Sequence, residues 1–227
     1  MFDVIRTVND KISTACKRSG RYPDDVKLVA VSKRFPVQRI TEAYESGLRI
    51  FGESKAQELR DKVGVLPENI EWHFIGHLQT NKVKYVVPFA KLIHSVDSIH
   101  LAQAISAYAV KNGHKPNVLM EVNTSDEESK FGFNVENSCE AYQQINKLQG
   151  LHICGLMTMA PFVSEEDEIR KAFRKLKKIQ KQLKQMDLGL DVRELSMGMS
   201  QDYEIAIEEG STMVRIGTAI FGKREAV

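Results

Sequence analysis

The stretches Glu194-Leu-Ser-Met-Gly-Met-Ser200 and Met213-Val-Arg-Ile-Gly-Thr218 decide the fold class of this chain of 227 residues. Each is an apolar run that breaks into a turn of glycine, serine or threonine and is followed by a segment with helical patterning. A strand that ends in small residues and opens a helix exposes backbone N–H groups at the positive end of the helix dipole, where phosphate binds well. Two consecutive turns of this kind predict one phosphate held from two sides.

The same succession of strand and helix runs through the rest of the chain. An amphipathic helix is predicted over residues 2–19, and eight apolar runs follow it, each leading into helical patterning. Because these runs lack strict alternation of polar and apolar residues, they are typical of strands covered on both faces. The predicted strands are 28–32, 49–52, 72–76, 92–96, 117–122, 152–157, 194–200 and 213–218. The predicted helices include 37–46 and a long helix over 165–186. Four further helices are predicted to begin at residue 54, at residue 80, at residue 97 or 98, and at residue 135.

This order of elements predicts an α/β fold, a (β/α)8 TIM-type barrel preceded by an N-terminal helix. An open doubly wound sheet is the alternative. No linker rich in proline, glycine or serine divides the chain, so we expect a single domain over residues 1–227.

Composition excludes several classes of protein. The chain is 42% hydrophobic and 27% charged with a formal net charge of +2, and its basic and acidic residues are mixed, so we expect no nucleic-acid partner. Lysines crowd the segment 165–186, but Phe173, Leu176, Ile179 and Leu183 form an apolar stripe there, so the lysines are interpreted as its solvated face.

The cysteines and the N-terminus bear on the compartment. Cys16, Cys139 and Cys154 are odd in number and far apart, which fits neither a disulfide framework nor a metal site. The N-terminus has no long apolar core, and no stretch approaches the length of a membrane span. We therefore expect a cytoplasmic protein with no membrane partner.

In a barrel of this class the active site lies at the carboxyl ends of the strands, and phosphates often bind beside the last two loops. Ser196 and Ser200 offer hydroxyls there, Gly198 lets the backbone approach a ligand, and Gly217 and Thr218 open the last helical segment. The alternative is that the glycines only make tight turns. Two such turns in register favour the phosphate site.

Two cationic side chains are predicted to lie beside this phosphate site. Lys33 ends the first strand, where partial loss of solvent lowers the pKa of an amine and makes it nucleophilic, although a surface lysine in a loop is the alternative. Arg215 interrupts an apolar strand, so it is expected to bind either a ligand or a glutamate such as Glu121. An amine, a phosphate site and an arginine in one barrel together suggest pyridoxal 5′-phosphate (PLP) as cofactor.

Ordered motifs across nearly the whole chain make a specific resemblance. They are Val29-Ala-Val-Ser-Lys33, Phe51-Gly-Glu53, Trp72-His-Phe-Ile-Gly-His-Leu-Gln79 with Asn81-Lys82, Lys130-Phe-Gly132, Gly155-Leu-Met-Thr-Met-Ala-Pro161, Leu195-Ser-Met-Gly-Met-Ser200 and Arg215-Ile-Gly-Thr218 with Ile220-Phe-Gly222. In this order they resemble the YggS/PROSC family of PLP-binding, PLP homeostasis proteins.

The resemblance implies a fold-type III PLP barrel like the N-terminal domain of alanine racemase. It implies that Lys33 forms the internal Schiff base and that Arg215 faces the pyridine nitrogen. The remaining implied cofactor-binding residues are Ser196, Ser200, Gly217 and Thr218 at the phosphate, Met197 beside the cofactor, and His77 and Met157 at the mouth. The family usually has asparagine after Gly-Glu, whereas this chain has Ser54, which leaves no clear contact for position 54.

The resemblance also implies a protein without catalytic turnover that regulates PLP and serves PLP-dependent apo-enzymes. No large apolar stripe stands out for the surface, so we expect a monomer. An arginine at the ring nitrogen weakens the ring as an electron sink. The chain also ends after the barrel, whereas racemases of this fold type carry a second domain. A small PLP-dependent racemase or lyase is the first alternative. A sugar-phosphate enzyme is the second, with Glu53 and Glu121 as its nearest acid and base candidates.

Overall fold

A closed barrel of parallel strands forms the centre of the computed structural model, which describes residues 1–125, 127, 131–186 and 190–223. The strands follow one another around the barrel in the order β1, β2, β3, β4, β5, β7, β8 and β9, and β9 pairs with β1 to close it. Their bounds are Lys27–Val31, Ile50–Glu53, Glu71–Phe74, Leu92–Val96, Asn117–Asn123, His152–Met157, Glu194–Met199 and Met213–Ile216. The predicted (β/α)8 barrel is confirmed, and the open sheet is excluded.

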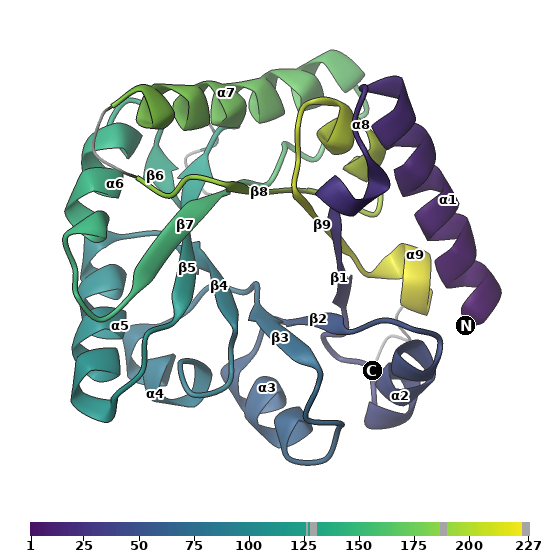
Figure 1. The fold of residues 1–227 in the computed structure, drawn as a ribbon, viewed down its shortest axis with the longest axis horizontal. Helices are drawn as coiled ribbons and strands as arrows, with labels where there is room; N and C mark the ends of the chain where they lie inside the picture. Colours follow the sequence, from purple (N-terminus) through teal and green to yellow (C-terminus); the bar gives the residue numbers. More distant parts are fainter. Residues whose placement is uncertain (126, 128–130, 187–189, 224–227) are drawn as a thin grey trace.

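Helices surround the ring of strands on the outside (Figure 1). The α-helices are α1 Phe2–Arg18, α2 Val37–Glu45, α3 Ala56–Val63, α4 Val83–Val86, α5 Ile99–Asn112, α6 Ser138–Asn146, α7 Glu166–Gln185, α8 Tyr203–Glu208 and α9 Thr218–Phe221, and short 3-10 turns lie at Pro23–Asp25 and Thr80–Lys82. No helix in the described part of the chain is long and apolar enough to cross a membrane.

The main apolar core lies between the strands and the helices. Phe51, Phe74 and Ile93 of the strands belong to one buried cluster with the inner faces of the helices, such as Leu176 and Ile179 of α7. A second, smaller cluster comes from strands alone and occupies the inner face of the barrel: Leu92, Leu119, Cys154, Met157 and Met213. The inside of the barrel is therefore packed, and a ligand has room only at its ends.

The N-terminal helix covers the seam where the last strand meets the first. It packs against α8 and α9, beside which Figure 1 shows it. Ile5, Val8 and Ile12 give it a buried face, and Arg18 forms ion pairs with Glu204 and Glu208 of α8. The predicted helix over residues 2–19 is thus confirmed to within one residue.

Two elements differ from the prediction. Segment 133–134, expected to be part of a loop, forms a short strand, β6, which pairs with the end of β5 outside the closed ring. The helix expected from Thr80 is reduced to a 3-10 turn and the short α4, which ends just before Pro88, a residue that has no N–H to donate to the preceding turn.

Candidate functional site

The two turns that follow β8 and β9 are joined by a single hydroxyl group. Ser200 Oγ accepts hydrogen bonds from the backbone N–H groups of Gly217, at 3.2 Å, and Ala219, at 3.3 Å. These N–H groups therefore converge on one oxygen at the start of α9, which is how a protein presents donors to a phosphate oxygen. Thr218, between them, is exposed, whereas Gly217 is buried.

A bulge in β8 shapes this part of the site. The pairing of β8 with β9 steps from Ser196 opposite Met213 to Met199 opposite Arg215, so β8 contains one extra residue. Gly198, inside the bulge, has a φ of +96°, which strongly favours glycine. The carboxylate of Asp202 then accepts a hydrogen bond from Met199 N–H and fixes the turn before α8.

Lys33 lies in the turn directly after β1, as expected, and is half-buried. The turn is held on both sides: Ser32 N–H donates to the Gly52 carbonyl at 3.0 Å, and Arg34 N–H donates to the Glu58 carboxylate at 2.8 Å. Arg34 adopts a left-handed backbone with a φ of 65°. The position of Lys33 is therefore set by fixed neighbours rather than by a free loop.

A buried ion pair between Lys62 and Glu53 also supports the turn that contains Lys33. Lys62 Nζ of α3 lies 2.8 Å from Glu53 Oε1 and also donates to the Ser32 carbonyl at 3.1 Å. Ser32 Oγ donates to the same Glu53 oxygen at 2.6 Å, while Glu53 Oε2 has no hydrogen-bond partner among the described residues. Burial raises the pKa of Glu53, and Lys62 opposes that rise. Glu53 of β2 and Lys62 of α3 thus stabilise the Lys33 turn together.

Arg215 lies inside the barrel and is almost fully buried. One terminal nitrogen donates to the carbonyl and the hydroxyl of Ser196, at 2.9 and 2.6 Å, and the other donates to the Thr158 carbonyl at 2.9 Å. Among the described residues no carboxylate lies within ion-pair distance, so the predicted alternative of a Glu121 partner is wrong. Burial lowers the pKa of Arg215 to about 10. This value is still well above 7, so the guanidinium stays charged at neutral pH.

Glu121 lies near the carboxyl end of β5, opposite Met157 of β7, and is 4% exposed. Its pKa is raised to about 7, first by burial and then by the charge of Asp97, while the charge of Arg215 opposes the rise. A carboxyl group that titrates near neutral pH at the mouth of a barrel is a candidate acid or base.

The other predicted residues occupy different surroundings. Met157 belongs to the cluster inside the barrel, whereas Met197 belongs to the main core shared with the helices. His77 follows β3, bonds Asp97 at 2.8 Å and stacks on Phe131 with 4.0 Å between ring centroids. The backbone of Ser54 packs closely against Gly76, because a Cβ added to Gly76 would lie 2.2 Å from the Ser54 carbonyl oxygen. Lys130 of the motif Lys130-Phe-Gly132 lies outside the described residues.

The structure does not bring Ser196 and Ser200 together as one pair of phosphate hydroxyls. Ser196 is fully buried, and its Oγ lies between Arg215 and His94, 2.8 Å from His94 Nδ1. Sequence reasoning missed Thr158 as a partner of this arginine and His94 as a partner of Ser196. The available signal for His94 was a histidine inside a run otherwise rich in apolar residues, Leu92–Val96, where a buried polar side chain needs a partner.

Comparisons with known proteins place this arrangement in context. Residues 9–225 match the family model of the alanine racemase N-terminal domain. A pyridoxal phosphate homeostasis protein of Aquifex aeolicus is 43% identical over 219 residues, or 96% of each chain. A solved structure of an unknown protein from Bifidobacterium adolescentis has a TM-score of 0.92 and 40% identity, covering 96% of this chain and 93% of that one. PipY of Synechococcus elongatus PCC7942, solved with PLP bound, has a TM-score of 0.81 and 34% identity, covering 93% of this chain and 100% of that one.

Proposed function

Because this chain belongs to the alanine racemase N-terminal domain family and, within it, to the pyridoxal phosphate homeostasis proteins, we propose that it binds PLP at the carboxyl ends of β1, β8 and β9. The observation that carries the proposal is the adjacency of three groups on these strands. Val29 pairs with Arg215, so the strand that leads to Lys33 runs beside the strand that holds the arginine. The joined turns at Ser200 and Gly217 complete the set.

The residues present fit the chemistry of this cofactor. PLP carries an aldehyde that condenses with an amine, an anionic phosphate, and a ring nitrogen that interacts with a neighbouring group. Lys33 supplies the amine, and the N–H groups of Gly217 and Ala219, with the hydroxyls of Ser200 and Thr218, supply phosphate donors. The buried, charged Arg215 faces the ring nitrogen. His77, Met157 and Met197 complete the surroundings of the cofactor.

The proposal gives Ser196 a role that differs from the one expected. Its buried hydroxyl already accepts from Arg215 at 2.6 Å and bonds His94, so it is engaged inside the barrel. We therefore assign Ser196 to holding Arg215 instead of the phosphate.

We further propose that the protein holds and releases PLP without turnover, as a cytoplasmic monomer that serves PLP-dependent apo-enzymes. A cationic Arg215 disfavours a protonated ring nitrogen, since like charges repel, and this weakens carbanion chemistry. Cys16, Cys139 and Cys154 are all free thiols, which fits a reducing compartment.

The covalent assignment is tested with Lys33→Ala and a matched control, Lys111→Ala, at an exposed position on α5. The native chain and the control are expected to be yellow with PLP and to retain a borohydride-fixed mass increase on the peptide that contains Lys33. Lys33→Ala is expected to lose both. An unchanged adduct in Lys33→Ala, or an adduct mapped to another lysine, contradicts the assignment.

A PLP-dependent racemase or lyase is the second candidate, favoured by Glu121, whose pKa of about 7 suits an acid or base. The discriminating measurement is exchange of the α-proton of L- and D-amino acids in deuterated water, using the PLP-loaded protein. Exchange that Glu121→Gln abolishes supports the enzyme, and absence of exchange in the native chain supports the carrier.

A further inference from the structure

A continuous chain of hydrogen bonds crosses the inside of the barrel from Arg215 to the opposite end. Arg215 donates to Ser196 Oγ at 2.6 Å, and Ser196 Oγ lies 2.8 Å from His94 Nδ1. His94 Nε2 lies 2.9 Å from His73 Nδ1, and His73 Nε2 lies 2.9 Å from Glu71 Oε1. The serine and both histidines are at most 1% exposed.

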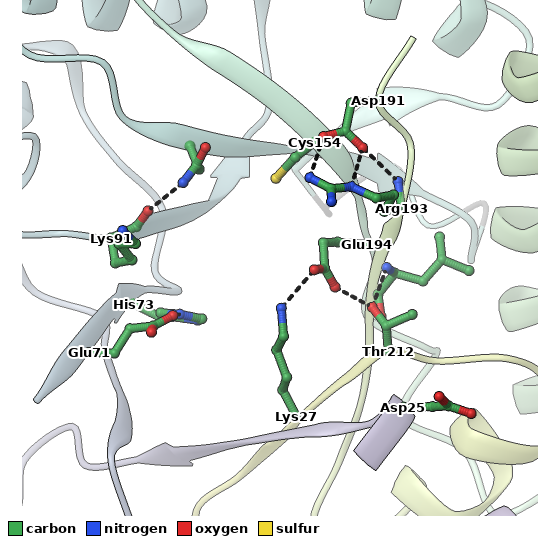
Figure 2. A network of polar contacts seen from close by, with 12 residues as sticks. Asp25, Lys27, Glu71, His73, Lys91, Cys154, Asp191, Arg193, Glu194 and Thr212 are labelled. Carbon is green, nitrogen blue, oxygen red and sulfur yellow. Dashed lines mark hydrogen bonds and ion pairs between the residues drawn. The ribbon is translucent and has the colours of Figure 1, made fainter. Parts of the chain in front are cut away.

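The chain ends among charged residues at the amino ends of the strands. Figure 2 shows this end, with Glu71 and His73 on one side and Lys27 reaching Glu194 on the other. Glu71 is partly exposed there, and its pKa is lowered first by the hydrogen bond from His73, and further by the nearby charges of Lys27 and Lys91. The chain therefore runs from a buried cation to a carboxylate that reaches solvent.

One assignment of protons satisfies every group in this chain with neutral imidazoles. A guanidinium only donates, so Ser196 accepts from Arg215, and in this assignment its own proton goes to His94 Nδ1. His94 is then protonated at Nε2, which donates to His73 Nδ1. His73 is likewise protonated at Nε2 and donates to the Glu71 carboxylate. In this assignment every proton in the chain points away from Arg215.

The electrostatics of the barrel interior agree with this assignment. Burial holds the pKa of His94 well below its usual range, and the charge of Arg215 lowers it further. A protonated His94 would have no lone pair for Ser196 and would place a second buried positive charge near that of the arginine. The neutral form with its proton on Nε2 is the one that satisfies all of the groups in the chain.

We propose that Ser196, His94, His73 and Glu71 form an oriented relay that positions Arg215 for the ring nitrogen of the cofactor, with His94 as its central positioning residue. This role rests on the proposed function, because it assumes that Arg215 faces PLP. The hydrogen-bonded relay itself does not rest on the proposed function. It keeps the Ser196 lone pair turned toward Arg215, so the guanidinium stays in one orientation on β9.

The relay is tested first in the protein without PLP. Nitrogen-15 NMR of labelled histidine distinguishes the two neutral tautomers and the imidazolium, and the six histidines of the chain are assigned by substitution. His73 and His94 are expected to be neutral with the proton on Nε2 at neutral pH. A proton on Nδ1, or an imidazolium, at either residue overturns the relay whether or not the protein binds PLP.

The positioning role is tested with two variants, each of which keeps one of the two hydrogen-bonding positions of the His94 ring. In His94→Asn the amide oxygen replaces Nδ1 and still accepts from Ser196, but contact with His73 is lost. In His94→Gln the amide replaces Nε2 and still bonds His73, but Ser196 loses its acceptor. His100→Asn, at an exposed position on α5, is the control for histidine replacement.

The relay predicts that His94→Gln binds PLP about tenfold more weakly than the native chain, because Ser196 loses the hydrogen bond that keeps its lone pair turned toward Arg215. His94→Asn and the control are expected to bind within about twofold of the native chain, by titration of the visible absorbance. A purely structural histidine predicts the opposite order, because asparagine leaves the larger cavity. Equal or reversed affinities therefore contradict the positioning role. If the native chain binds no PLP, the proposed function fails while the NMR result still decides the relay.

Discussion

Gly198 and Ala206 lie in such close contact that a Cβ added to the glycine would come within 2.5 Å of the Ala206 Cβ and 2.9 Å of the Tyr203 Cα. The contact brings the bulge of β8 directly against α8. Gly198 also needs its φ of +96°, so the geometry of this turn depends on the absence of a side chain. The turn carries Ser200, and the position of the proposed phosphate site follows from it.

Gly198→Ala is therefore expected to be destabilised by about 3 kcal/mol or more, because backbone strain and overpacking add. Gly20→Ala is the matched control, since Gly20 also has a positive φ, +68°, but has no atom within 4 Å of an added Cβ. The control is expected to lose about 1 kcal/mol from strain alone. Urea denaturation measures both, and equal losses would show that the contact with α8 is unimportant.

Lys62→Met is expected to destabilise the chain by about 3–5 kcal/mol, because it leaves the buried Glu53 without its cation. The double variant Lys62→Met with Glu53→Gln removes the buried charge as well, and we expect it to recover part of the loss. The free energy of unfolding of the four chains forms a double-mutant cycle. A double variant no more stable than Lys62→Met would show that Glu53 is not the source of the loss.

Glu121→Gln is expected to change the pH dependence of stability. The folded-state pKa of Glu121 is raised from 4.5 to about 7, so its contribution to stability is fully present below pH 4.5 and is lost as the pH rises through about 7. The glutamine variant should gain up to about 3 kcal/mol over the native chain at pH 8 and lose this advantage in acid. Urea denaturation across this range measures it, with the exposed Glu68→Gln as control. A difference that does not vary with pH would contradict the shift.

Ser200→Ala is expected to bind PLP about tenfold more weakly, because a charge-assisted hydrogen bond to the phosphate is removed and the two turns are no longer joined. Pyridoxal, which lacks the phosphate, is the matched ligand and should bind the native chain and the variant alike. Titration of both ligands tests this. If the substitution weakens both equally, Ser200 acts on the whole site and not on the phosphate.

Much of the fold was predictable because parallel βα units leave a strong local signal. The bounds of β4 and β7 agree residue for residue with prediction, since short apolar runs between turn residues mark fully buried strands. The short β6 left no such signal, because a two-residue strand is too brief to show periodicity and depends on pairing with β5.

The candidate site was predictable in its parts but not in its connections. Lys33, Ser200 and Gly217 lie at strand ends, and the sequence shows strand ends directly. The contact between Arg215 and the Thr158 carbonyl is invisible in sequence, because every residue has a carbonyl and only folding selects one. The same holds for Ser196, which resembles Ser200 in the sequence but faces the barrel interior because of the strand alternation and the bulge.

The packing of α1 against α8 and α9 constrains how the chain is made. Ile5, Val8 and Ile12 are synthesised long before α8 and α9, the helices that α1 packs against. Likewise β1 obtains its partner β9 only after all of the intervening strands have been synthesised. The apolar face of α1 therefore stays uncovered while most of the barrel is made, and apolar surface exposed in this way favours association with other chains until the barrel closes.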